Sequence, residues 1–297
     1  MSSFDSHLPA LTTEQAEFLR ELVRQYHARQ GDSVTVSGDT VHADPGTRSL
    51  YNLAEQCRRA EPGAWPQLVT DHFDALNNAT RSADAGGEDI LGRVYLRLMP
   101  DDALPADAAE SFSYTRPVAT GLLEALALDL PDSVRLLHDG DVARVGLEEL
   151  RSAGRARLVG EPVDHDVART DSGATVHLVT GGSMFVASKA LVLGDLARTL
   201  TGRELPDDGA LFTVPSRHFL VFHPLEDHHA VGAINDLASF GLGAYQDNPG
   251  PLSPRIYWWH KGTVTCLTHI DEATVSFSVV PPDDLMAILR RLNDTAS

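Results

Sequence analysis

The sequence contains few cysteines. Cys57 and Cys266 are the only two in 297 residues, and they lie far apart in the chain. Two thiols at that separation are too few for the disulfide framework of a small secreted domain or for a cysteine-rich zinc site. Cys57 lies on an apolar helical pattern and Cys266 in a strand pattern. We therefore expect both to be buried as small hydrophobic residues, not exposed as reactive thiolates.

Positive charge is also scarce. The chain has 24 Lys and Arg residues against 42 Asp and Glu, which gives a formal net charge of −18. Binding to nucleic acid or to an anionic membrane depends on basic side chains that neutralise phosphate groups, so we expect neither as a partner. Long apolar runs are missing too, since stretches such as residues 122–130 fall short of the ~20 residues that a membrane-spanning helix needs.

The remaining composition is that of a globular protein. Hydrophobic residues make up 42% and charged residues 22% of the chain, whose length corresponds to one large or two average domains. Residues 1–9 show neither the basic start nor the apolar core of a signal peptide, so we expect a cytoplasmic location.

Residues 1–80 are predicted to be mostly helical. Thr12 and Gln15 form a capping-box pattern at the start of a helix that Gly31 ends. Alternation over residues 33–42 predicts a small hairpin. Two further helical stripes follow, one starting at Leu50 and one at Trp65.

Residues 81–89 have the small, polar composition of a linker or exposed loop, and residues 90–297 are predicted to form one α+β domain. The expected strands are residues 94–98, 122–128, 175–180, 184–187, 211–214, 218–222, 255–259, 264–267 and 275–280. The expected helices are residues 141–151, 190–200, 229–241 and 283–292. Because strands and helices do not alternate evenly, the prediction is an α+β fold: a helical N-terminal region followed by mixed or antiparallel sheets flanked by helices.

Negative charge is concentrated in one part of the chain. From Asp84 to Glu149 there are 14 acidic and 5 basic residues, a net of 5 − 14 = −9. One interpretation is a solvated surface, since net charge serves solubility. The other is an acidic rim, with Asp101, Asp102 and Glu110 as its candidate residues, that docks a protein partner with a basic surface.

Histidines are clustered in residues 217–229. Neutral imidazole and carboxylate are ligands for zinc, iron or manganese, which makes a metal site at His218, His223, Asp227 and His228 one hypothesis. The spacing argues against it, because residues 218 and 223 of one strand face opposite sides and no helical metal-binding pair accompanies them. We therefore expect structural or solvated histidines, and no cofactor.

An aromatic strand follows a proline-rich segment at residues 248–260. Adjacent side chains of a strand face opposite sides, so one of Trp258 and Trp259 is expected in the core and the other partly exposed. Aromatic residues and arginine are enriched in protein interfaces, which makes Arg217, Tyr257, Trp258 and Trp259 candidate contact residues. The alternative is that this strand simply packs in the core.

Motifs of covalent and phosphate chemistry are missing. The sequence has no Gly-x-Ser-x-Gly nucleophile elbow and no glycine-rich phosphate-binding loop. No catalytic residue is predicted from the sequence.

Several segments, in their order along the chain, resemble the YtpQ-type family of bacterial proteins, a domain of unknown function. They are residues 50–53 (Leu-Tyr-Asn-Leu), 65–73, 94–100, 126–134, 214–222 and 251–254. The resemblance covers residues 50–280, and the Arg-rich, polar passage at residues 154–171 departs from it. The family has no established activity, so the resemblance implies a related fold and no catalytic residues.

These observations favour a non-enzymatic, cytoplasmic protein-interaction module: an adaptor, a regulator or an inhibitor-like partner. The alternatives are a hydrolase or metal-dependent enzyme centred on residues 218–229, and a structural subunit of a larger assembly.

Overall fold

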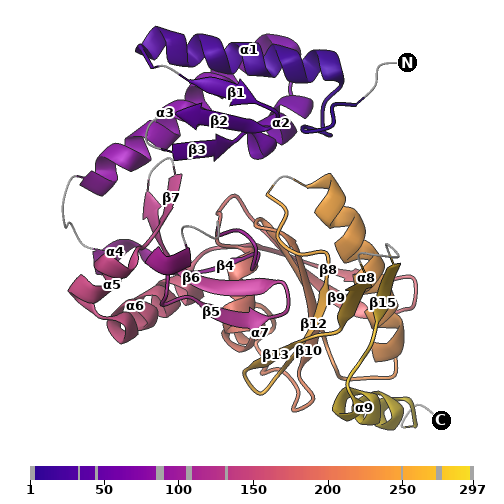
Figure 1. Cartoon of the computed structure of the whole chain (residues 1–297). Helices are drawn as coiled ribbons and strands as arrows, with labels where there is room; N and C mark the ends of the chain where they lie inside the picture. The colour runs from indigo at the N-terminus through magenta and orange to yellow at the C-terminus, as the bar shows by residue number, and fades with distance from the viewer. Residues whose placement is uncertain are drawn as a thin grey trace. The chain divides into compact units, whose positions relative to one another are not determined.

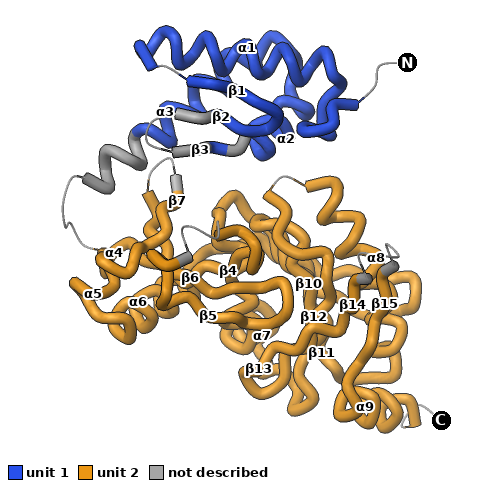
Figure 2. The backbone as a smooth tube through the Cα atoms, in the orientation of Figure 1, with its two compact units in different colours: residues 1–86, 131–133 blue, residues 87–130, 134–297 orange. Residues whose placement is uncertain are grey.

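The computed structural model describes residues 4–32, 34–43, 46–84, 90–104, 109–130, 133–248, 250–271 and 276–294. The chain divides into two compact units (Figure 2). Unit 1 comprises residues 1–86 and 131–133, and unit 2 comprises residues 87–130 and 134–297. Of the expected linker, residues 81–84 belong to a helix and residues 85–89 lie outside the described residues.

Unit 1 combines helices with a small antiparallel sheet. Its elements are α1 (Thr13–Gln30), β1 (Thr35–Ser37), β2 (Thr40–Ala43), β3 (Gly46–Ser49), α2 (Tyr51–Arg58), the 3-10 turn η1 (Pro62–Ala64) and α3 (Trp65–Asp84). The predicted capping box forms at Thr12 and Gln15, and Gly31 ends α1 with a left-handed φ of 80°. The helical stripes pack into one core around Leu53, Trp65 and Phe73.

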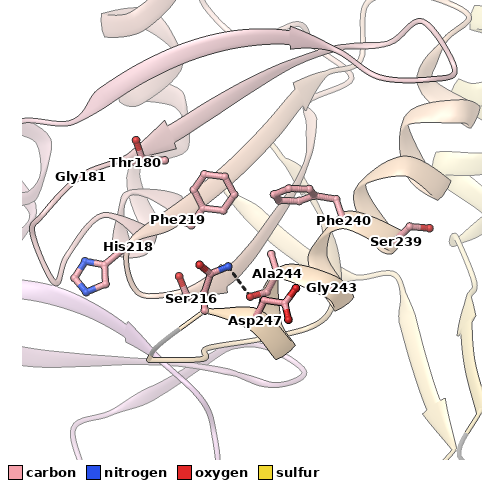
Figure 3. Close-up of a pocket in the computed structure, with 11 residues that line it drawn as sticks. Thr180, Gly181, Ser216, His218, Phe219, Ser239, Phe240, Gly243, Ala244 and Asp247 are labelled. Atoms are coloured by element: carbon pink, nitrogen blue, oxygen red, sulfur yellow. Dashed lines mark hydrogen bonds between the residues drawn. The ribbon is translucent and has the colours of Figure 1, made fainter. Parts of the chain in front are cut away.

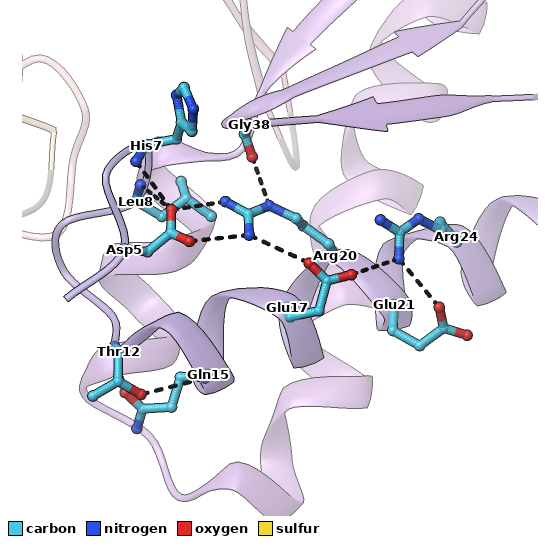
Figure 4. A network of polar contacts seen from close by, with 10 residues as sticks. All are labelled: Asp5, His7, Leu8, Thr12, Gln15, Glu17, Arg20, Glu21, Arg24 and Gly38. Atoms are coloured by element: carbon cyan, nitrogen blue, oxygen red, sulfur yellow. Dashed lines mark hydrogen bonds and ion pairs between the residues drawn. The ribbon is translucent and has the colours of Figure 1, made fainter. Parts of the chain in front are cut away.

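A buried ion pair fastens the start of the chain to unit 1 (Figure 4). Asp5 lies 2.7 Å from Nη2 of Arg20 on α1, and both side chains are less than 10% exposed. The backbone amides of His7 and Leu8 donate to the Asp5 carboxylate, and Arg20 Nε donates to the carbonyl oxygen of Gly38 in the β1–β2 turn. The network therefore joins three segments.

Unit 2 begins with a sheet in which β4 and β5 flank β6, with β7 also pairing with β6 (Figure 1). The elements here are α4 (Ile90–Arg93), β4 (Val94–Met99), η2 (Ala109–Ser111), β5 (Arg116–Ala119), β6 (Leu122–Leu130), β7 (Ser133–Leu136), α5 (Asp139–Val145) and α6 (Leu147–Gly160). Helix α6 packs closely on β4 at Gly154. A Cβ atom at this position would lie only 2.9 Å from the Leu96 amide nitrogen, so the close approach requires glycine.

The rest of unit 2 is built on a six-stranded sheet of order β13-β12-β10-β11-β9-β8. Its elements are β8 (Asp164–Arg169), β9 (Thr175–Thr180), η3 (Ala187–Val192), α7 (Leu193–Thr201), β10 (Ala210–Ser216), β11 (Phe219–Pro224), α8 (Ala230–Asp247), β12 (Ile256–His260) and β13 (Thr263–Cys266). A short pair, β14 (Thr268–Asp271) and β15 (Ser276–Val279), and helix α9 (Asp283–Asp294) complete it.

Both faces of the six-stranded sheet are buried. Helices α8 and α9 pack on the face that carries Leu211 and Trp258, while η3 and α7 pack on the face that carries Phe212 and Tyr257. Every strand pair whose register is described is antiparallel. The predicted α+β class is confirmed, with antiparallel sheets.

Two local predictions were wrong. Residues 184–187 were expected as a strand, but they form a turn that leads into η3. Phe185 and Val186 in this turn are buried by packing against neighbouring elements, without strand pairing. The helix expected at residues 141–151 is split into α5 and α6 by Gly146, whose φ of 110° is incompatible with a continuous helix. In the described part of the chain, no helix is both long and apolar enough to cross a bilayer.

Candidate functional site

The candidate site is centred on the turn between β10 and β11, which other segments hold in place. The Arg217 amide donates to the carbonyl oxygen of Gly250, and the Ala187 amide donates to the carbonyl oxygen of Arg217. Gly250 has a φ of 66°, and a Cβ there would lie 2.6 Å from Arg217 Nε. Glycine at this position therefore serves two purposes: it adopts a left-handed conformation and leaves room for the Arg217 side chain.

His218 orients the guanidinium group of Arg217. Its Nδ1 lies 3.0 Å from the carbonyl oxygen of Ser183, and its Nε2 lies 3.1 Å from Arg217 Nε. A carbonyl oxygen only accepts and a guanidinium only donates, so these partners assign a neutral ring protonated at Nδ1. Burial and the charge of Arg217 lower the pKa of His218, which favours the same neutral form.

Arg97 approaches the turn from strand β4. The Leu98 amide donates to Ser188 Oγ, which fixes this strand against η3. Phe185 stacks on Tyr95 with ring centroids 4.2 Å apart, and the Arg97 guanidinium carbon lies 5.9 Å from the Phe185 centroid. Arg97 Nη1 is buried and has no hydrogen-bond partner.

The two arginines form a pair of unneutralised charges. In the part of the chain that the structure describes, no carboxylate lies within ion-pair distance of Arg97 or Arg217. Burial and the nearby charge of Arg217 lower the pKa of Arg97 to about 10, and burial also lowers the pKa of Arg217. We call Arg97, Arg217 and His218 the basic cluster.

A groove adjoins the basic cluster (Figure 3). It has a volume of about 680 Å³ and lies between α8 and the ends of β9, β10 and β11. Ser216 and His218, on either side of Arg217 in the chain, both line it, and so do Phe219 and Phe240. The lining combines these two aromatic rings with polar side chains from both the strand ends and α8.

The aromatic strand is largely unavailable for contacts, which corrects part of the predicted interface. Tyr257 is fully buried, with its hydroxyl 2.7 Å from Ser253 Oγ, and Trp258 is 5% exposed with Nε1 donating to the carbonyl oxygen of Asp208. Trp259 is half-buried against the opposite face. The predicted alternation of the two tryptophans is confirmed, but helices cover both faces.

The other predicted interface residues have different positions. Arg217 is half-buried in the basic cluster. Asp101 and Asp102 are exposed in the turn after β4, where Asp101 accepts a hydrogen bond from the Gly121 amide. Glu110 is exposed in η2.

The four residues of the alternative metal hypothesis do not gather in the described part of the chain. Among the described residues, no group of three or more His, Cys, Asp or Glu side chains is arranged to hold a metal ion. His218 donates to Ser183, whereas His223 is buried with Nδ1 2.7 Å from the carbonyl oxygen of Thr175. Asp227 and His228 are exposed. Nδ1 of His218 and Nδ1 of His223 thus lie against backbone carbonyls of different segments, and the candidate residues do not share one site.

The two thiols differ in exposure. Cys57 is buried, as predicted, and burial raises its pKa to about 12. Cys266 is half-buried, and burial also raises its pKa.

Arg97 and Gly250 are the site residues that sequence reasoning missed. Arg97 is the single charged residue of the otherwise apolar strand Val94–Met99, and a lone charge in such a strand was the available signal. Comparison with known proteins adds no information about the site: no family model, curated protein or solved structure matches the chain.

Proposed function

We propose that this protein is a binding module whose unit 2 recognises an oxyanion at the basic cluster. The observation that carries the proposal is the buried, partnerless Nη1 of Arg97 beside a second arginine with no carboxylate partner. A buried charge without a hydrogen-bonding counter-ion is costly, and native structures rarely keep one. An oxyanion bound here would supply both the charge and the acceptors.

The chemistry of the cluster matches this ligand class. Guanidinium groups bind carboxylate and phosphate oxygens through parallel, charge-assisted hydrogen bonds. The bond from Arg217 Nε to His218 leaves the two Nη groups of Arg217 for a ligand. His218 uses one ring nitrogen as donor and the other as acceptor, which supports a role in positioning Arg217 over a role in proton transfer.

A protein partner remains part of the proposal. Asp101, Asp102 and Glu110 are exposed carboxylates that a basic partner surface could contact. We further propose a cytoplasmic location and a relationship to the YtpQ-type family, neither of which assigns an activity.

The test is titration calorimetry of the full chain with inorganic phosphate, sulfate and acetate at low ionic strength. We expect binding of at least one of these anions by the wild-type chain. Arg97→Gln and Arg217→Gln should each weaken it by about tenfold or more, the usual effect of losing a charge-assisted hydrogen bond.

Arg290→Gln is the matched control, because Arg290 is an exposed arginine of α9 and its loss changes the net charge equally. Circular dichroism verifies that each variant is folded. Absence of anion binding by the wild-type chain, or equal binding by both cluster variants and the wild type, would contradict the proposed function.

A further inference from the structure

The groove and the basic cluster share residues of two chain segments. Around the β10–β11 turn, Ser216, His218 and Phe219 line the groove, and the intervening Arg217 is hydrogen-bonded to His218. After α8, Asn248 lines the groove, and Gly250 contacts the Arg217 side chain. A ligand held by Arg217 would therefore have the groove beside it.

An aromatic wall forms the middle of the groove. Phe219 and Phe240 meet with ring centroids 5.4 Å apart and planes inclined by 53° (Figure 3). Phe240 is 40% exposed, so part of its ring is accessible to a ligand in the groove. An additional aromatic ring placed against this pair would gain both apolar burial and edge-to-face contacts.

Charge gives the groove a direction. His218 lies at one end of the lining in Figure 3, and the Asp247 carboxylate lies on the α8 side. An anionic group would be repelled by Asp247 and attracted by the arginines next to His218. Anion and apolar group of one ligand are thus expected in a fixed order along the groove.

Resting on the proposed oxyanion site, we propose that the ligand is a phosphate monoester that carries an aromatic group. Its phosphate would contact Arg97 and Arg217, and its ring would pack against Phe219 and Phe240. Two guanidinium groups without a carboxylate partner match the roughly −1.5 to −2 charge of a phosphate monoester near neutral pH better than a singly charged carboxylate. The same chemistry occurs in a free aryl phosphate and in a phosphotyrosine side chain.

Isothermal titration of the full chain compares inorganic phosphate, phenyl phosphate and a short phosphotyrosine peptide. We expect phenyl phosphate to bind about tenfold more tightly than inorganic phosphate, which corresponds to roughly 60 Å² of additional apolar burial. Phe240→Ser should remove this advantage, so that this variant binds phenyl phosphate and inorganic phosphate with similar affinities. Tighter binding of the peptide than of phenyl phosphate would identify the ligand as a phosphotyrosine side chain of a protein. Equal or weaker binding of the peptide would identify it as a small aryl phosphate.

Val231→Ser is the matched control, since Val231 is 49% exposed on the same helix and does not line the groove. Equal affinities of the wild-type chain for phenyl phosphate and inorganic phosphate would overturn the aromatic ligand while the oxyanion site stands. Binding of phenyl phosphate by Phe240→Ser as tightly as by the wild type would also overturn the aromatic ligand and leave the oxyanion site standing. Failure of all the phosphates to bind would overturn the aromatic phosphate ligand, and failure of sulfate and acetate as well would overturn the oxyanion site.

Discussion

Arg97 is a single residue whose buried charge opposes the stability of the folded chain. It is the only charged side chain of β4, its Nη1 has no partner, and burial together with Arg217 lowers its pKa to about 10. Its contact with the Phe185 ring offsets roughly 1 kcal/mol of the free energy that burial of the uncompensated charge costs. The remainder is a cost that the folded chain bears in the absence of an anion.

Replacing Arg97 with methionine should therefore stabilise the anion-free protein. Methionine keeps the unbranched aliphatic stem of arginine and removes the uncompensated charge. We therefore expect the free energy of unfolding to rise by about 1–3 kcal/mol. Urea denaturation in a buffer without phosphate or sulfate measures this change. Arg290→Met, at an exposed position, should stay within roughly 0.5 kcal/mol of the wild type. A less stable Arg97→Met variant would mean that the guanidinium has a stabilising role.

At the scale of elements, the β8–β9 hairpin is joined by a pair of histidines. His165 Nε2 lies 3.0 Å from His177 Nδ1, and the His177 ring stacks on Phe222 of β11 with centroids 4.6 Å apart. One imidazole donates and the other accepts, so the hydrogen bond requires at least one neutral ring. Burial, with smaller contributions from His165 and His223, lowers the pKa of His177 to about 4.

This pair predicts a loss of stability in mild acid. The pKa of His177 is about 4 in the folded chain and near its ordinary 6.5 in the unfolded chain. Below pH 6.5 the unfolded chain binds a proton that the folded chain does not bind. The contribution of neutral His177 is therefore complete above pH 6.5 and is lost as the pH falls toward 4. Because the ring is only partly buried and solvent screens its charge, the expected loss of stability is about 2 kcal/mol, less than the full pKa shift would give.

Urea denaturation at pH 6.5 and near pH 4, the two pKa limits of His177, tests this prediction. His177→Phe keeps the stacking on Phe222 and should lose about 2 kcal/mol less than the wild type between these conditions. His228→Gln is the control, because His228 is exposed and should behave as the wild type does. If His177→Phe and the wild type lose equal stability, the acid sensitivity comes from other groups.

At the scale of the whole molecule, each unit has its own hydrophobic core. One core is formed by residues of unit 1 alone, and separate cores lie on the two faces of the large sheet in unit 2. The polar network of Asp5 and Arg20 belongs to unit 1 only (Figure 4). A change in this network should therefore affect one unit and spare the other.

Replacing Asp5 with alanine tests this independence. The substitution leaves the Arg20 guanidinium buried without its carboxylate, and breaking such a pair typically costs about 3–5 kcal/mol. Hydrogen exchange read by mass spectrometry should show faster exchange in α1, α2 and α3 and unchanged exchange in β9, β10 and β11. Glu14→Ala, at an exposed position of α1, is the control. Faster exchange throughout both units would show that they unfold together.

The sequence by itself determined the features that depend on neighbouring residues. The capping box at Thr12, the end of α1 at Gly31 and the apolar stripes of unit 1 were predicted because capping and helical periodicity act within a few residues. The strands around Phe212 and Trp258, and the α+β class, followed from apolar runs and alternation in the same way.

Only the tertiary structure decided which side chains meet. Arg97 lies on a strand of one sheet and Arg217 in a turn of another, and their proximity depends on η3, on Gly250 and on the stacking of Phe185. The burial of Tyr257 and Trp258 likewise depends on helices that come from other parts of the chain. Local pattern specifies the face of a strand and not what covers that face, because the covering element is chosen by packing between distant segments.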